Sequence, residues 1–272
     1  EAKTLNEVVV IGYGSVKRKN VTGAVSVVDT KTIETLRPVK IEQALQGTVA
    51  GVNVTTAGGA PGASLSILIR GVATNGDTSP LVLIDGYVGD LSVLNPSDVE
   101  SITVLKDAQA AIYGANGANG VILVTTKSGK RNSKAKISFN SSTGIQEASR
   151  TLPTLNATEY ALLLNESYAN GGKTIPYPNV SGLGEGTNWQ KEIMNPAPII
   201  NYDLSISGGS DKIFYAVSAS HLAQDGIIGG DKSGFERNTA RVSLGADVSD
   251  RLKLKTNIIY TNLTRKTIND NG

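Results

Sequence analysis

The sequence predicts a small α+β domain followed by a series of antiparallel strands, and three observations support this division. The chain of 272 residues contains 30 glycines and only 5% aromatic residues, a composition typical of strands joined by tight turns. Before Lys130, short apolar runs alternate with loops and helical segments. After Lys130, apolar and polar residues alternate with a period of two, as in a strand with one buried face.

In the first part, compact apolar runs bounded by turn residues predict buried strands. These runs lie at residues 25–29, 66–70, 80–85, 99–105 and 121–126. The spacing of Ile41, Ala44 and Leu45 predicts a short helix within residues 39–48. A second helical turn is expected at residues 108–113, where the glycine-rich stretch 114–120 ends it. Together these elements predict a mixed α+β domain with its strands in the interior.

In the second part, each alternating segment has roughly the 10-residue length that a tilted strand needs to cross a bilayer. The segments centre on residues 137–140, 200–207, 213–219, 239–247 and 252–260. Short turns are expected at 208–212 and 249–251. Longer loops are expected at 224–235 and 147–198, the second with a helix near residues 159–168.

Two architectures fit this alternation, a transmembrane β-barrel and a soluble β-sandwich. The charged residues on the polar faces fit a water-filled lumen, and they fit a solvent-exposed face equally well. They are Arg237, Arg241, Asp247, Lys253 and Lys255. A barrel that encloses a plugged lumen has ~22 strands, and an open edge in lipid is costly. The barrel interpretation therefore requires a fragment, or one piece of a split receptor.

Composition argues against several classes of function. A formal net charge of +2 gives no strong attraction to nucleic acid. The absence of cysteine removes disulfides, thiolate metal sites and cysteine nucleophiles. The single histidine, His221, is expected to be a polar strand-end residue. The segment 12–17 lacks the third glycine of a dinucleotide fingerprint. We therefore expect no catalytic residue, no metal and no cofactor.

Targeting signals are also absent from the sequence. Residues 1–20 lack the basic start and apolar run of a signal peptide, so an exported protein would be seen here as a mature or a trimmed chain. No stretch approaches the ~20 consecutive apolar residues of a transmembrane helix.

A dense and ordered set of motifs resembles one known family. The motifs occupy residues 5–14, 20–25, 41–54, 69–71, 80–86, 95–96, 99–108 and 111–127. They resemble the plug segment of the SusC/RagA-type TonB-linked outer-membrane receptors of Bacteroidetes. The resemblance is specific over residues 5–130 and looser from there to residue 272. Small departures occur at Ala111-Ile112 and at residues 114–117, where other members often carry Ala-Leu and Gly-Ser-Arg-Gly.

The resemblance implies a division into three segments. Residues 1–20 would contain the TonB-interacting segment, residues 21–130 the plug domain, and residues 131–272 the first strands and loops of an outer-membrane β-barrel. The expected TonB-interacting residues are Glu7, Val8, Val9, Val10 and Ile11. TonB would bind them by strand addition, although an ordinary edge strand of the plug is the alternative.

Other positions are implied as landmarks of the plug, namely Arg70, Gly71, Asp85, Gly86, Tyr113, Gly114, Gly117 and Gly120. Arg70 and Asp85 either serve turn geometry or, for Arg70, form an ionic contact between plug and barrel wall. Tyr177 and Trp189 lie in the long loop and either stack on a sugar ring or pack within the loop.

The resemblance implies a transporter of the bacterial outer membrane, not an enzyme. TonB, a SusD-like surface lipoprotein and a glycan or peptide cargo are the expected partners. The expected function is TonB-dependent import of large nutrients, most commonly oligosaccharides, with the plug gating the lumen. The alternatives are a TonB-dependent receptor for peptides, siderophores or cobalamin and, in another class, a soluble binding or surface-adhesion module.

Overall fold

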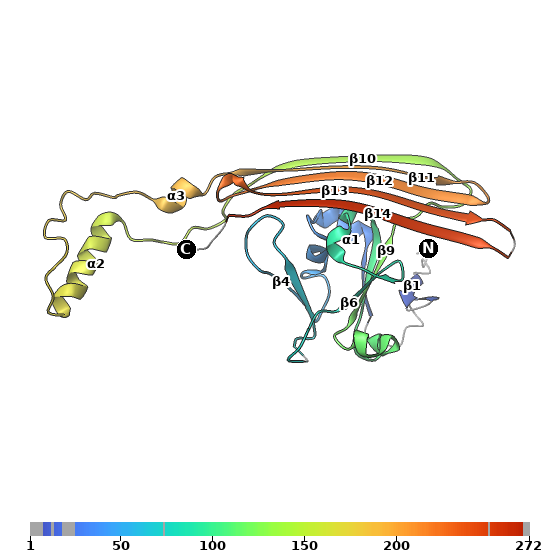
Figure 1. The fold of residues 1–272 in the computed structure, drawn as a ribbon, viewed down its shortest axis with the longest axis horizontal. Helices are drawn as coiled ribbons and strands as arrows, with labels where there is room; N and C mark the ends of the chain where they lie inside the picture. The colour runs from blue at the N-terminus through green and yellow to red at the C-terminus, as the bar shows by residue number, and fades with distance from the viewer. Residues whose placement is uncertain (1–7, 12–13, 18–24, 73, 250, 269–272) are drawn as a thin grey trace, which may run out of the picture.

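The computed structural model describes residues 8–11, 14–17, 25–72, 74–249 and 251–268. Its two parts form two layers, with a long curved sheet lying over one side of a smaller domain (Figure 1). The predicted order, an α+β domain followed by antiparallel strands, is confirmed. We call the smaller domain the plug domain and the long sheet the wall.

The plug domain is built on a mixed five-stranded sheet. In spatial order its strands are β3 (Val25–Asp29), β8 (Val99–Leu105), β9 (Val121–Thr126), β6 (Leu81–Ile84) and β7 (Tyr87–Val88). Only the β6–β9 pair in this sheet is parallel. Two hairpins stand beside it, β4 (Val52–Thr56) with β5 (Leu65–Ile69), and β1 (Val8–Ile11) with β2 (Gly14–Lys17). The five strands predicted for this part are all present.

Short helices connect these strands. They are α1 (Thr30–Leu36) and the 3-10 helices η2 (Ile41–Leu45), η3 (Leu91–Val93), η4 (Pro96–Asp98) and η5 (Asp107–Gly117). The Asp29 side chain caps α1 by accepting a hydrogen bond from the Thr32 amide at 2.8 Å. The sequence lacks a strong helical period at 30–36, and α1 was not predicted. The glycine-rich stretch was expected to end a helical turn after residue 113; Gly114, at φ 62°, does break the helical geometry there, but η5 resumes after it and runs to Gly117.

The plug domain has an apolar core at the centre of its sheet. Ile41 and Leu45 of η2, Ile102 of β8 and Ile122 of β9 have no exposed surface. Burial of such side chains contributes about 1.5–3 kcal/mol each. These buried side chains give the plug domain an apolar core of its own.

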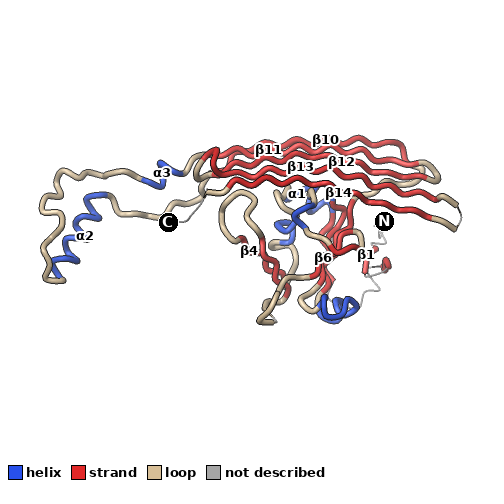
Figure 2. The backbone as a smooth tube through the Cα atoms, viewed as in Figure 1, coloured by secondary structure: helices blue, strands red, loops and turns tan. Residues whose placement is uncertain are grey.

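The wall is an antiparallel sheet whose strands follow one another in chain order. They are β10 (Ser133–Gln146), β11 (Ala197–Gly209), β12 (Ile213–Gly226), β13 (Gly230–Asp247) and β14 (Lys253–Lys266). One face of the wall packs on the plug domain, and the other is exposed (Figure 2). All five strands are longer than the alternating segments that predicted them.

The connections of the wall differ from prediction at one place. Residues 224–235 were expected to form a long loop, but β12 runs to Gly226 and β13 begins at Gly230. The prediction is wrong because the glycines serve a tight hairpin: Gly229 and Gly230 have positive φ, and a register shift follows Asp225.

The other long connection is confirmed, and it extends beyond one end of the wall in Figure 1. It contains the predicted helix as α2 (Ala157–Asn170), and a second, unpredicted helix, α3 (Trp189–Ile193). Within the described residues, no helix is both long enough and apolar enough to cross a membrane.

Candidate functional site

The plug domain and the wall meet through buried polar side chains, which we call the seat. Arg241 of β13 is its centre and is only 2% exposed. Its Nη1 donates to Thr126 Oγ1 at 3.1 Å, and its Nη2 donates to the Lys127 carbonyl. Its Nε lies 3.6 Å from Asp98 Oδ1. One wall arginine therefore joins the end of β9 to the turn before β8.

Burial in the seat disfavours the ionised form of the Asp98 carboxyl. Burial raises the pKa of the Asp98 carboxyl above its usual value, and two neighbouring wall residues, the Ser218 hydroxyl and then the Arg241 guanidinium, oppose that rise. The carboxylate therefore depends on its wall partner. Removing one member of a buried ion pair typically costs 3–5 kcal/mol, roughly, because the other charge remains buried.

Asp85 extends the seat on the side of β14. Its backbone is in the left-handed region at φ 50°, followed by Gly86 at φ 94°. Its Oδ1 accepts from the Thr126 amide at 2.9 Å, and its Oδ2 accepts from Thr126 Oγ1 at 2.6 Å. Asn257 Nδ2 of the wall donates to the same Oδ2 at 2.6 Å. The Asp85 carboxylate thus links the plug sheet to β14.

A second acidic node binds the turn that contains η4. Asp203 of β11 accepts from Asn95 Nδ2 at 2.6 Å and from Ser97 Oγ at 2.9 Å. Asn201 Nδ2, two residues away, donates to Asp203 at 2.8 Å and completes the node. The turn at residues 95–98 is therefore held from both β11 and β13.

Charges continue along the seat toward the end of the wall that carries α2. Arg237 is 2% exposed and Glu42, on η2, is 7% exposed. Among the described residues, Glu42 Oε2 and Arg237 Nε have no hydrogen-bond partner. Burial raises the pKa of Glu42, and the nearby Lys40 and Arg237 oppose the rise. The opposite charges of Glu42 and Arg237 attract each other across the seat, but the two side chains are not joined by a hydrogen bond.

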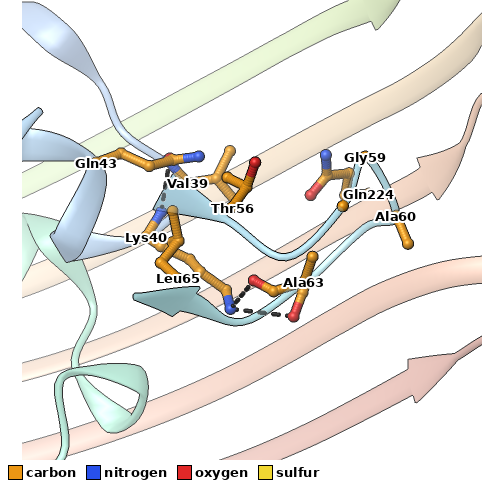
Figure 3. Close-up of a pocket in the computed structure, with 11 residues that line it drawn as sticks. Val39, Lys40, Gln43, Thr56, Gly59, Ala60, Ala63, Leu65 and Gln224 are labelled. Atoms are coloured by element: carbon orange, nitrogen blue, oxygen red, sulfur yellow. Dashed lines mark hydrogen bonds between the residues drawn. The ribbon is translucent and has the colours of Figure 1, made fainter. Parts of the chain in front are cut away.

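A cavity of about 260 Å³ lies beyond the Glu42–Arg237 pair, under the loop that joins β4 to β5. Figure 3 shows its lining, which includes Lys40, Gln43, Thr56 and, from the wall, Gln224. Lys40 Nζ donates to the carbonyls of Gly62 and Ala63 at 3.0 and 2.8 Å, and so ties this loop to the start of η2. We call this space the apical cavity.

The wall contributes the aromatic side chain of Phe235 to the surroundings of Lys40 and Gly62. The Phe235 ring lies 5.6 Å from Lys40 Nζ, a cation–π contact. It also fills the space beside Gly62, where a Cβ would lie 2.2 Å from the ring. Gly62 has φ +64°, so both its backbone and its surroundings require glycine.

Comparison with known proteins identifies this arrangement. The family model described as the TonB-dependent receptor plug domain matches residues 17–121. TonB-dependent receptor P26 of Formosa agariphila is 40% identical over 266 residues, covering 95% of this chain and 27% of that protein. TonB-dependent receptor SusC of Bacteroides thetaiotaomicron is 35% identical over 276 residues, covering 96% and 27%. This chain belongs to the SusC/RagA-type TonB-dependent receptors.

A solved structure supports the same assignment. The RagAB peptide importer in its open-open state has a TM-score of 0.84 at 30% identity, over 97% of this chain and 33% of that one. The chain spans about a quarter of the length of the curated relatives it matches. The wall is accordingly the unclosed beginning of a SusC/RagA-type barrel, and the sandwich alternative is wrong.

The landmark residues of this TonB-dependent receptor mostly shape the plug backbone. Arg70 has φ 60° and donates its amide to the Gly51 carbonyl at 2.8 Å, in a turn completed by Gly71. Gly117 has no room for a Cβ beside the Ala110 carbonyl, and Gly120 has none beside Ile69. Tyr113 packs against the smaller apolar cluster of the plug. The turn interpretation fits Arg70, and its ionic contact with the wall stays a prediction.

Other predicted residues lie away from the seat. Val8–Ile11 pair with β2, while Glu7 lies outside the described residues. Tyr177 and Trp189 belong to the long connection with α2 and α3, and neither lines the apical cavity. His221 is inside β12, not at its end, because that strand extends to Gly226.

Sequence reasoning missed the chemistry of the seat. Arg237 and Arg241 were expected to face water, in a lumen or in solvent, but the plug domain buries both. The available signal was their position on the polar face of a strand beside Thr239 and Ser243. That pattern indicates a polar face, and only the packed plug decides whether that face is wet.

Proposed function

We propose that this chain is the gate of an importer, not an enzyme, in which TonB drives uptake of a large nutrient across the bacterial outer membrane. The supporting observation is the seat. A permanent plug would be served well by an apolar interface, whereas Arg241, Asp98, Asp85 and Asp203 form contacts that water can replace.

The proposed division of labour follows the three segments implied by the sequence. Residues 1–20 bind TonB, residues 21–130 close the lumen, and residues 131–272 begin the barrel. TonB would add a strand to Val8–Ile11, with Glu7 preceding them. Among the described residues β1 and β2 pair only with each other, so one edge of each short strand is open for such an addition.

Cargo would reach the plug from the side of the long connection, near the apical cavity. We propose an oligosaccharide cargo delivered with the help of a SusD-like surface lipoprotein, in line with the similarity to SusC. A peptide cargo is the second candidate, supported by the similarity to the RagAB peptide importer. Siderophore receptors are less similar, at 16–19% identity among the solved structures and 28% for the ferric enterobactin receptor PirA of Pseudomonas aeruginosa, so a siderophore cargo ranks below the other two.

Deletion of residues 7–11 from the full-length receptor tests this proposal. We expect uptake to be abolished while surface binding of cargo persists, because binding precedes the step that TonB drives. Deletion of residues 148–152 in the long connection is a length-matched control, and we expect it to retain uptake. Unchanged uptake after deletion of 7–11 would refute the proposal, and binding without energised uptake in the intact receptor would indicate an adhesion module.

A further inference from the structure

Positive charge gathers at the apical end of the seat without carboxylate partners. At the centre of the seat, Arg241 has the Asp98 carboxylate 3.6 Å from its Nε. Toward the apical cavity, by contrast, Lys40, Arg237 and Arg265 have no carboxylate oxygen within 4.0 Å among the residues that the structure describes. We call these three side chains the apical cation cluster.

The register of the wall brings the cluster together. Arg265 of β14 is directly paired with Phe235 of β13, so both side chains lie on the face that meets the plug domain. Arg237 lies two residues further along β13 and therefore on the same face. The Phe235 ring lies 5.6 Å from the Lys40 ammonium, which brings the plug member of the cluster to the same place. Arg265 is exposed there, whereas Arg237 is 2% exposed.

The charges around Lys40 leave an excess of positive charge. Burial lowers the pKa of the Lys40 ammonium, Arg265 and Arg237 lower it further, and the carboxylates of Glu42 and Asp90 oppose them. Three cations thus face two carboxylates, and burial raises the pKa of one of these, Glu42, which disfavours its negative charge. A partly desolvated ammonium that two guanidinium groups repel is stabilised when an anion binds beside it.

The apical cavity adds neutral hydrogen-bonding groups to this charge. Gln43 Oε1 accepts from two backbone amides at 2.9 and 3.1 Å, and its side-chain nitrogen makes no hydrogen bond among the described residues. Gln224 Nε2 donates to Gln146 Oε1 at 3.1 Å, so its own oxygen remains to accept. Thr56 lines the same space with its hydroxyl group (Figure 3). Amide and hydroxyl groups of this kind are suitable partners for the hydroxyls of a sugar.

The size of the cavity limits what can enter it. Its volume is about 260 Å³. Pockets that enclose a whole small ligand have roughly 300–1,000 Å³. The apical cavity therefore suits one ring or one terminal group of a larger cargo.

We infer that the apical cavity is a subsite for one negatively charged sugar of the cargo, a uronate or a sulfated residue, whose anionic group is bound by Lys40 and Arg265. The inference rests on the proposed import function and narrows its cargo to acidic oligosaccharides. Arg237 does not line the cavity, so it strengthens the positive field without touching the sugar. The neutral lining groups bind the ring hydroxyls and favour a sugar over the carboxylate of a peptide.

Two cations of β14 provide a matched test. Arg265 and Lys255 are both exposed, and their even spacing puts both on the face that meets the plug domain, at opposite ends of the strand. Neither makes a hydrogen bond or an ion pair among the described residues, so replacement by glutamine breaks no described contact. Full-length receptor in detergent, native or with Arg265→Gln or Lys255→Gln, is titrated with sodium glucuronate or with glucose at constant ionic strength. Saturation-transfer NMR measures the binding.

We expect native receptor to bind glucuronate more tightly than glucose by roughly tenfold or more, because hydrogen bonds to charged groups are the stronger ones. Arg265→Gln should remove most of this preference, and Lys255→Gln should retain it. No preference for glucuronate, or one that survives Arg265→Gln, would overturn the subsite.

Competition separates the sources of the anionic group. Displacement of glucuronate by inorganic sulfate would support a sulfated sugar, and resistance to sulfate would support a uronate. Displacement by N-acetylglycine at lower concentration than by unlabelled glucuronate would overturn the sugar in favour of a peptide carboxylate. Uptake is measured separately: if the glucuronate preference holds while deletion of residues 7–11 leaves uptake unchanged, the proposed import fails and the subsite stands.

Discussion

The interior of the plug domain and its seat on the wall are equally buried but chemically opposite. Ile102 and Ile122 have no exposed surface, and Arg241, at 2%, has almost none. The interior gains stability by keeping apolar surface from water, and opening it is costly throughout. The seat gains stability from hydrogen bonds and ion pairs, which water can replace when the parts separate. Burial alone therefore does not tell a permanent contact from a removable one.

The largest expected effect comes from breaking the seat at its centre. Arg241→Met leaves Asp98 buried without its partner, and we expect a loss of about 3–5 kcal/mol in plug–wall stability. Full-length receptor carrying the substitution should admit large antibiotics that the outer membrane normally excludes. The double variant Arg241→Met with Asp98→Asn removes both charges and should recover part of the loss. A single variant as tight as the native receptor would contradict the role of the seat.

The corresponding test of the interior is Ile102→Ala. The cavity left in the core should cost about 2–5 kcal/mol of plug stability. Urea unfolding of the full-length receptor in detergent, followed by proteolysis of the plug, measures it. No substitution of the polar wall residues of the seat should restore the loss, because the wall side chain that packs against this core is the apolar Ile259 of β14. Restoration of plug stability by a substitution in the seat would contradict the distinction between the core and the seat.

A smaller effect is expected where the plug loop touches the wall. Gly62→Ala and Gly47→Ala both place a side chain at positive φ, but only at Gly62 does the Cβ meet the Phe235 ring. We expect about 1–2 kcal/mol for the backbone in each, and about 1–3 kcal/mol more at Gly62 from the clash. Urea unfolding of the two full-length variants in detergent measures both effects. Equal destabilisation by the two substitutions would show that Phe235 moves freely.

The smallest effect concerns Glu42, whose raised pKa makes stability depend on pH. Because the folded state holds the proton of this carboxyl more tightly, its contribution to stability is complete at a pH below the unfolded-state pKa of about 4.3. That contribution is lost as the pH rises through the folded-state pKa. Glutamine does not ionise, so Glu42→Gln avoids this loss of stability at high pH. The variant should therefore be more stable than the native protein by about 1 kcal/mol at neutral pH. The advantage should disappear near pH 4. Denaturant unfolding across this range checks it, and a less stable variant at neutral pH would show that Arg237 depends on the charge.

The predictions from sequence succeeded where the evidence is local. Five plug strands, η2, the break at Gly114 and α2 were all predicted from local sequence, the strands and η2 from their apolar residues and the break from its glycines. The hairpin at residues 227–229 was missed because glycine-rich sequence is compatible with both a long loop and a tight turn. Helix α1 was missed because residues 30–36 lack a clear apolar period, and the N-cap at Asp29 is its main signal. Family motifs located the plug, but not what holds it in place.

The sequence by itself determined the period of two in the wall, the buried strands of the plug and the family to which both belong. Only the tertiary structure decided that Arg241 contacts Asp98 and that Asp203 binds Asn95, because these partners lie more than 100 residues apart. A strand's alternation specifies that one face is polar. Whether that face meets water or another domain depends on what packs against it, and here the plug domain packs on it and buries its polar side chains.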